Sequence, residues 1–184
     1  MTEIRIHGRG GQGAVTLADM IARIALAFKK HSQTMPLFGV ERRGAAMRTS
    51  VRIADHPIKV HSQSFKPNMV VLMHGNLLQT AQADSKHENA VFVQSGTAPL
   101  PVSGPQWYVD AVSIAHKHGL VSSGEPFINF PMLGALCRVL NLPEPLMEEE
   151  ISDRWTGSVL DANLAAAREA YRSVQYLEGS VSAC

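Results

Sequence analysis

The chain has 184 residues, of which 45% are hydrophobic and 18% are charged, a composition typical of globular proteins rather than disordered ones. Its 17 basic and 16 acidic residues nearly cancel, so the charge balance suggests neither a nucleic-acid-binding face nor a membrane-surface patch. The length suits one domain with its own core, and no internal repeat or linker divides it, which predicts a single domain over residues 1–184.

The cysteines and histidines do not form a metal-binding pattern. Cys137 lies in an apolar run and Cys184 ends the sequence, and neither has a neighbour at metal-ligand or redox spacing, so we expect no metal and no iron–sulfur cluster on this chain. The histidines are scattered, and the closest pair, His116 and His118, is expected on a solvated helix surface. Free thiols, the absence of a signal peptide and the absence of a membrane-length apolar run predict a cytoplasmic protein that does not contact a membrane.

The first elements form a strand, a loop and a helix. Residues 4–7 alternate between apolar and polar side chains and predict a strand, and residues 14–30 have the apolar period of a helix. Between them lies a loop, called the glycine loop below, that consists of Gly8, Arg9, Gly10, Gly11, Gln12 and Gly13.

The glycine loop has the composition of an anion-binding site. Glycines allow positive φ and a close approach of backbone to ligand, while the N–H groups and dipole of a helix N-terminus attract phosphate. Arg9 adds a positive charge. A purely structural turn is the alternative, but ligands of open α/β sheets collect at the carboxyl ends of strands, where this loop is expected to lie.

Residues 31–46 are expected to form a long connection rather than a strand, and a connection of that length suggests a function. Nicotinamide and flavin sites place an acidic residue about 20 positions after their glycine loop, whereas residues 31–36 contain none. Ordinary dinucleotide binding is therefore disfavoured. Binding of a dinucleotide with a phosphorylated ribose stays open, because Lys29 and Lys30 supply positive charge for that phosphate.

The remaining elements complete an α/β pattern. Residues 47–53 predict a half-exposed strand, with residues 58–60 as its hairpin partner. The continuous apolar run 69–73 predicts a central strand, and further strands are expected at 90–93 and 107–111. Helices are expected at 75–84 with Asn76 as its N-cap, at 127–140, at 146–155 and at 161–177, followed by a frayed tail over 178–184. The predicted fold is a three-layer α/β/α sandwich with a mostly parallel, mixed sheet.

A second motif, residues 39–44, places Glu41 before Arg42 and Arg43. Taken alone it is either a charged surface turn or a pair of guanidinium forks for phosphate or carboxylate. Together with the glycine loop and residues 48–53, it closely resembles the gamma subunit of the 2-oxoacid:acceptor oxidoreductases, a family with pyruvate, ketoisovalerate and phenylglyoxylate enzymes. The likeness covers most of the chain, and it continues through Asn129, Leu133, Gly134, Ala135, Leu136, Asn163 and Tyr171. Residues 119–126 depart from the family pattern as an inserted loop whose role stays open.

The resemblance implies a complex that oxidatively decarboxylates a 2-oxoacid to acyl-CoA and CO2. Thiamine diphosphate, Mg and iron–sulfur clusters are then expected in partner subunits: alpha, beta and a ferredoxin-like delta subunit, with an NAD-linked flavoprotein subunit as a further option. No magnesium motif for thiamine diphosphate and no nucleophile with its base stands in this chain, so no catalytic residue is expected on it.

The expected role of this chain is to help bind coenzyme A and to close the active site. The residues expected to bind it are Gly8, Arg9, Gly10, Gly11, Gln12, Gly13, Arg42 and Arg43. Glu41 is expected to orient an arginine, and Phe38, Trp155 and Arg42–Arg43 are expected at subunit interfaces, so that the chain is a subunit rather than a free monomer.

Two other functions stay open: a purely structural assembly subunit, in which both motifs serve packing, and an independent NADP-binding reductase. The sequence also leaves open which 2-oxoacid is used, whether ferredoxin or NAD is the final acceptor, and the stoichiometry of the complex.

Overall fold

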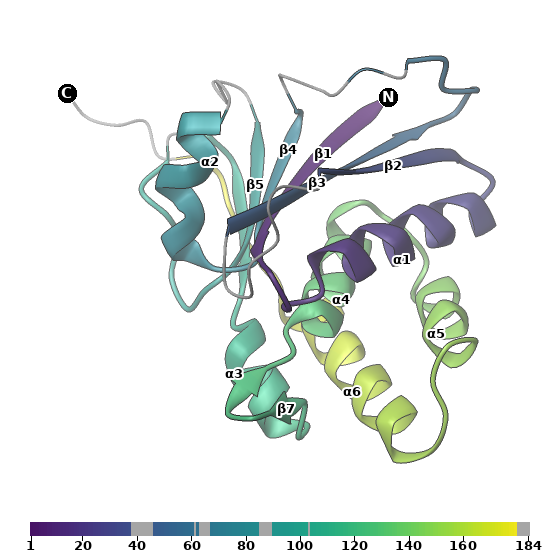
Figure 1. Cartoon of the computed structure of the whole chain (residues 1–184), viewed down its shortest axis with the longest axis vertical. Helices are drawn as coiled ribbons and strands as arrows, with labels where there is room; N and C mark the ends of the chain where they lie inside the picture. Colours follow the sequence, from purple (N-terminus) through teal and green to yellow (C-terminus); the bar gives the residue numbers. More distant parts are fainter. Residues whose placement is uncertain (38–45, 61, 63–66, 85–89, 103, 180–184) are drawn as a thin grey trace.

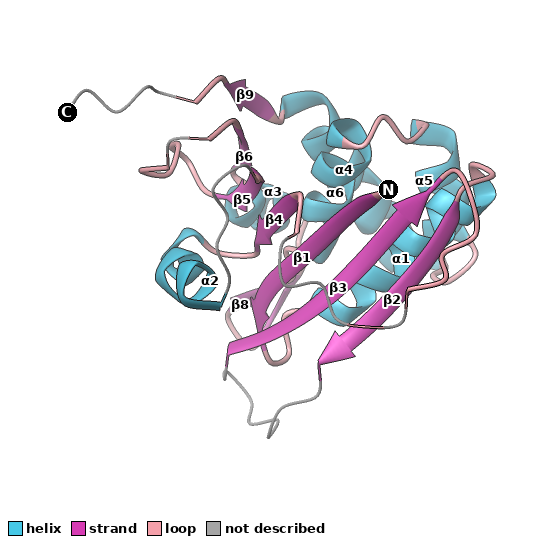
Figure 2. Cartoon of the chain, turned by 90° about the horizontal axis from the view of Figure 1, so that it is seen from above, coloured by secondary structure: helices cyan, strands magenta, loops and turns pink. Residues whose placement is uncertain are grey.

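The computed structural model describes residues 1–37, 46–60, 62, 67–84, 90–102 and 104–179. Its main sheet has seven strands in the spatial order β2-β3-β1-β4-β5-β6-β9 (Figures 1 and 2). These strands are β1 (Thr2–Arg9), β2 (His31–Leu37), β3 (Ala46–Ala54), β4 (Met69–Leu72), β5 (Val91–Ser95), β6 (Gln106–Val109) and β9 (Gln175–Leu177). A separate hairpin consists of β7 (Val121–Ser122) and β8 (Glu125–Pro126).

Helices cover both faces of the sheet (Figure 2). They are α1 (Ala14–Ala27), α2 (Leu78–Asp84), preceded by the short 3₁₀ helix η1 (Gly75–Leu77), α3 (Ala111–Lys117), α4 (Asn129–Val139), α5 (Glu144–Ser152) and α6 (Gly157–Ser173). The large core joins α1 and α3–α6 to one face, whereas α2 packs in a smaller cluster on the other face against Val70, Leu72 and Phe92. Alternate residues of one strand enter different cores, because side chains of a strand point to opposite faces.

The sheet is mixed and mostly parallel. β1, β4, β5 and β6 pair in parallel, whereas β3 lies antiparallel between β1 and β2, and β9 lies antiparallel to β6. Five of the seven strands therefore run in one direction, and the predicted fold class is confirmed.

The first β-hairpin of the sheet differs from the prediction. Residues 31–37, expected as part of a connection, form the edge strand β2, and its polar side chains and Pro36 are tolerated because only one side of it pairs. Residues 58–60, expected as a hairpin partner of β3, form no strand, because β1 and β2 already occupy both sides of β3.

The strand β3 is buried on both faces rather than half-exposed as predicted. Arg52, which is 3% exposed, donates from Nε to Oε1 of Glu3 at 2.8 Å and from Nη1 to the carbonyl oxygen of Val60 at 3.0 Å. These contacts compensate the guanidinium for lost water. Burial is also the first cause that lowers the pKa of Arg5 on the same face, with Glu3 acting in the opposite direction.

Some helices and strands begin or end at residues other than those predicted. Asn76 is not a helix N-cap, because the 3₁₀ helix already begins at Gly75. The last helix stops at Ser173 rather than at residue 177, because Val174 has an extended conformation. The three residues that follow form β9, a strand that was not predicted. Residues 119–126 contain the β7–β8 hairpin, and its two-residue turn, Ser123 and Gly124, has positive φ at both positions as in a type I′ turn.

One close contact joins the helices α4 and α6, and another joins the strands β6 and β9 at the sheet edge. A Cβ built on Gly134 of α4 would lie 2.0 Å from the carbonyl oxygen of Ala167 in α6, so glycine alone lets these helices approach so closely. At the sheet edge, the rings of Trp107 in β6 and Tyr176 in β9 lie 4.8 Å apart between centroids. Among the described residues, no helix is long and apolar enough to span a bilayer.

Candidate functional site

The candidate site lies at the carboxyl edge of the sheet, where β1 and β4 end side by side. The chain leaves β1 through the glycine loop into α1 on one face, and it leaves β4 through His74 and η1 into α2 on the other face. Adjacent strands whose connections depart to opposite faces form the crevice in which open α/β sheets bind ligands. The predicted position of the glycine loop at the end of the first strand and the predicted helix start at Ala14 are confirmed, but β1 extends through Gly8 and Arg9, so only residues 10–13 connect the strand to the helix.

Residues 9–12 of the glycine loop form a tight turn, which the side chain of Gln12 closes. The backbone N–H of Gln12 donates to the carbonyl oxygen of Arg9 at 3.1 Å, and the N–H of Arg9 donates to Oε1 of Gln12 at 3.0 Å. Gly11 occupies the third position of this turn with φ +89°, the conformation for which a type II turn selects glycine. A Cβ on Gly11 would meet no described atom within 4 Å, so the loop is open on that side.

Gly8 and Gly13 of the loop serve close packing. Gly8 is buried, and a Cβ there would lie 2.9 Å from Cβ of Ala14 and 3.2 Å from Cγ of Met73. Gly13 stands at the N-cap of α1 with φ +77°, and a Cβ there would lie 3.0 Å from Cγ of Asn129. Gly8 therefore joins strand to helix, and Gly13 joins α1 to the start of α4.

Two helix N-termini meet at Gly13. Asn129 is the first residue of α4, and within the described part of the chain no side chain caps either α1 or α4. Asn129 is 6% exposed, and its Oδ1 has no hydrogen-bond partner among the described residues. Uncapped N–H groups and a buried, unpartnered amide oxygen are features that a bound ligand satisfies.

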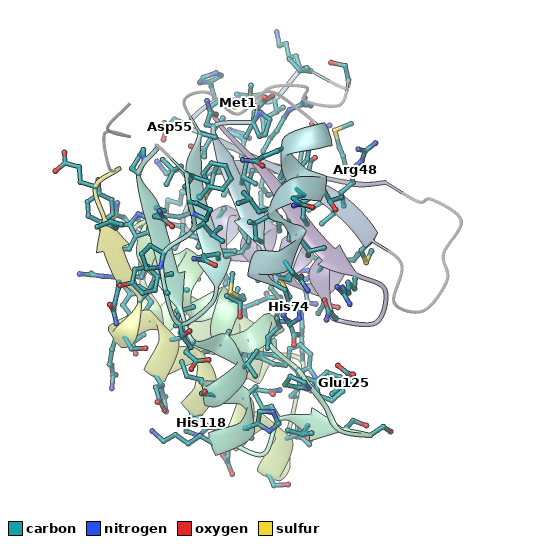
Figure 3. The ribbon with its side chains drawn as sticks, turned by 90° about the vertical axis from the view of Figure 1, so that its left-hand side faces the viewer. Met1, Arg48, Asp55, His74, His118 and Glu125 are labelled. Atoms are coloured by element: carbon teal, nitrogen blue, oxygen red, sulfur yellow. The ribbon has the colours of Figure 1, made fainter. Side chains whose placement is uncertain are left out.

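His74 joins the site from the end of β4. Its Nε2 lies 2.8 Å from Nε2 of Gln12, and Figure 3 shows His74 and Glu125 at the end of the sheet opposite Met1 and Asp55. Burial lowers the pKa of His74, the charge of Arg9 lowers it further, and Glu125 acts in the opposite direction.

A hollow lies farther along the same edge, away from the glycine loop. It has a volume of about 360 Å³ and opens over the ends of β5 and β6, with Asp110 and Lys117 in its lining. Asp110 accepts a hydrogen bond from the N–H of Ser113, and Lys117 binds Glu169, so these charged groups are engaged within the chain.

Only some of the predicted site and interface residues lie in the part of the chain that the structure describes. It brings Gly8, Arg9, Gly10, Gly11, Gln12 and Gly13 together at one edge, whereas Phe38, Glu41, Arg42 and Arg43 lie outside the described residues. Trp155, expected at an interface, is half-buried and packs edge-to-face on Phe130 at 4.9 Å within the chain.

Neither His74 nor Asn129 was expected at the site from the sequence. His74 follows the apolar run 69–73 directly, so the rule that ligands gather at the carboxyl ends of parallel strands was the signal for it. Asn129 entered only through the family likeness, since a helix start far along the chain gives no sign of which loop it meets.

Comparison with known proteins gives a consistent result. The model of the family "pyruvate ferredoxin/flavodoxin oxidoreductase" matches residues 3–173. The pyruvate/ketoisovalerate oxidoreductases common subunit gamma of Pyrococcus abyssi is 37% identical, over 97% of this chain and 100% of that protein. Pyruvate synthase subunit PorC of Methanothermobacter marburgensis is 36% identical, over 96% of this chain and 99% of that protein.

Solved structures share the fold. Pyruvate oxidoreductase subunit PORC from Thermotoga maritima superposes with a TM-score of 0.82 and 32% identity, covering 96% of this chain and 98% of that chain. A 2-oxoglutarate:ferredoxin oxidoreductase from Magnetococcus marinus, solved with 2-oxoglutarate, coenzyme A and succinyl-CoA bound, superposes with a TM-score of 0.75. At 19% identity, over 96% of this chain and 32% of that longer chain, it shows the fold alone.

The glycine loop, the fold and the matches along almost the whole sequence agree: this chain belongs to the pyruvate ferredoxin/flavodoxin oxidoreductase family, and the predicted likeness to its gamma subunits is confirmed.

Proposed function

We propose that this chain, as one domain over residues 1–184, is the gamma subunit of a thiamine diphosphate-dependent 2-oxoacid:acceptor oxidoreductase complex. The complex oxidatively decarboxylates a 2-oxoacid to acyl-CoA and CO2. Relatives named for pyruvate and ketoisovalerate support this class of substrate. Thiamine diphosphate, held with Mg by partner subunits, supplies the electron sink for decarboxylation, and iron–sulfur clusters in a ferredoxin-like partner carry the electrons away.

Within this complex the chain helps to bind coenzyme A and to close the active site. The observation that carries this role is the meeting of two helix N-termini at Gly13, beside Oδ1 of Asn129; neither the helix ends nor this oxygen has a side-chain partner among the residues that the structure describes. Coenzyme A has phosphates that accept hydrogen bonds, and a pantetheine arm with hydroxyl and amide groups that donate them. The N–H groups at the starts of α1 and α4 suit the phosphates, and the oxygen of Asn129 suits a donor of the arm.

Three arginines add positive charge for the binding of coenzyme A. Arg9 is exposed beside the turn, where its guanidinium is free to reach a phosphate held by the backbone. Arg42 and Arg43 add charge from the second motif, which supports closure over an anionic ligand. Gly8 and Gly13 act by letting the strand and both helices approach the turn.

Replacement of Gly11 with valine tests this role in the assembled complex. A β-branched residue at φ +89° costs roughly 1–3 kcal/mol of strain and places methyl groups on the open side of the turn. We expect the apparent affinity for coenzyme A to fall, while exchange of CO2 into the 2-oxoacid, which takes place on thiamine diphosphate in a partner subunit, continues.

Gly157→Val is the matched control, since Gly157 also has positive φ and open surroundings but begins α6 far from the glycine loop. Equal loss of coenzyme A affinity and exchange in Gly11→Val would show a structural glycine and favour the assembly-subunit alternative. Unchanged coenzyme A affinity would remove the loop from the binding site.

A further inference from the structure

The side chain of Gln12 connects two groups whose chemistry fixes its orientation. Its Oε1 accepts from the N–H of Arg9 at 3.0 Å, and its Nε2 lies 2.8 Å from Nε2 of His74. A backbone N–H can only donate, so the amide oxygen of Gln12 must face Arg9 and the amide nitrogen must face His74. An amide NH₂ also only donates, so Nε2 of His74 must accept, and the ring must be neutral with its proton on Nδ1.

From this chain of hydrogen bonds we propose that His74 is a positioning residue of the glycine loop. As a neutral imidazole it holds the amide of Gln12, and through Gln12 it holds the Arg9–Gln12 turn in the conformation that presents backbone N–H groups to an anionic ligand. Protonation of His74 places a donor against a donor and releases the turn. The effect on coenzyme A rests on the function proposed above, whereas the hydrogen-bond chain does not.

The surroundings of His74 favour the neutral form. Arg9 faces it from β1 and Glu125 from β8, and these are the charged groups that act on it among the described residues. Burial is the first cause of its lowered pKa, followed by Arg9, while Glu125 opposes both. Because the folded pKa of His74 lies below the unfolded value of about 6.5, the contribution of these hydrogen bonds to the stability of the turn is fully present above pH 6.5. It is lost as the pH falls through the folded pKa of His74.

A simple charge effect makes the opposite prediction. An imidazolium beside the turn would attract phosphate and tighten binding at low pH, whereas the positioning role weakens binding at low pH. The sign of the pH dependence therefore separates the two, and the tautomer of His74 can be observed directly.

The first test is NMR of the full chain labelled with ¹⁵N-histidine. At pH 7.5 we expect His74 to be protonated on Nδ1 and unprotonated on Nε2, with titration below pH 6.5. In Gln12→Glu the carboxylate accepts where the amide donated, so His74 is expected to carry a proton on Nε2 and to titrate above pH 6.5. An Nε2-protonated, neutral ring in the wild-type chain at pH 7.5 would overturn the proposal.

The second test measures amide hydrogen exchange at Arg9. His74→Gln places an amide oxygen near the position of Nε2 and restores an acceptor that does not titrate, whereas His74→Leu removes the acceptor. We expect the Arg9 N–H to lose protection by about fivefold to tenfold in His74→Leu, the factor for one hydrogen bond. In His74→Gln we expect it to keep its protection both at pH 7.5 and at a lower pH, chosen below the titration midpoint of His74 that the NMR experiment measures. His31→Gln, on the edge strand β2, controls for the loss of a histidine. Equal loss in the Gln and Leu variants would overturn the positioning role.

The third measurement follows coenzyme A affinity of the assembled complex at the same two pH values. We expect the wild-type affinity to fall at the lower pH and the His74→Gln affinity to hold. If the tautomer and the exchange pattern are as expected but the affinity does not follow them, the positioning role of His74 stands and the coenzyme A role of the loop fails.

Discussion

Replacement of Gly134 with alanine is expected to destabilise the chain, although helix propensity alone predicts the reverse. In the middle of α4, alanine is favoured over glycine by about 1 kcal/mol. However, the new Cβ would lie 2.0 Å from the carbonyl oxygen of Ala167 and 3.0 Å from the backbone nitrogen of Tyr171. Both atoms belong to the backbone of α6, so the overlap is relieved only if the two helices separate by more than an ångström.

Overpacking of a well-packed core costs typically about 1–3 kcal/mol, and a contact with backbone belongs at the upper end. Subtraction of the propensity gain leaves a net loss of about 2 kcal/mol, which corresponds to roughly 4–8 °C in Tm for a chain of this size. Urea denaturation and a thermal melt monitored by circular dichroism measure both quantities. The matched control is Gly75→Ala, whose Cβ would lie 3.2 Å from Oε1 of Gln94, the end of a flexible side chain, and which is expected to change stability by less than about 1 kcal/mol. A Gly134→Ala chain as stable as the wild type would show that the close approach of the two helices does not require glycine at this position.

Two further outcomes are expected. In a Cys184→Ser chain, the remaining thiol of Cys137 should react with Ellman's reagent at pH 8 only as the protein unfolds, because full burial raises its pKa and excludes the reagent; rapid reaction of the folded chain would contradict this. Hydrogen bonds from Lys117 and His118 lower the pKa of Glu169, so its contribution to stability is present above pH 4.5 and is lost as the pH falls through the folded pKa. The wild-type minus Glu169→Gln difference in unfolding free energy should therefore shrink in acid, and a difference that stays constant from pH 7 to pH 3 would rule out this ion pair as its source.

The parts of the fold that follow from local pattern were predictable from the sequence. The central strand β4 has a continuous apolar run, and α1 has a clear helical period that begins after a glycine loop. The edge strands β2 and β9 were missed, because a strand paired on one side can be polar or very short, as in residues 31–37 and 175–177.

Burial of charge and meetings between distant segments could not be predicted. The alternation in β3 suggested a solvent-facing side, yet Arg52 is buried because Glu3 and the backbone of Val60 compensate it. The glycine loop was visible in the sequence, but its closure by Gln12 and the approach of His74 depend on the pairing of β1 with β4. The sequence pattern predicts the turn, but it does not predict which distant residue, here His74, packs against the turn and orients it.

The position of β9 has a consequence for synthesis on the ribosome. β9 is contributed by residues 175–177, near the end of the chain, and it pairs with the edge of β6, where Tyr176 packs on Trp107. Until residues 175–177 leave the exit tunnel, the nascent protein has an open strand edge at β6, which is a template for pairing with other chains. The emergence of β9 therefore completes the sheet, and a polypeptide that stops before Gln175 would leave that edge exposed.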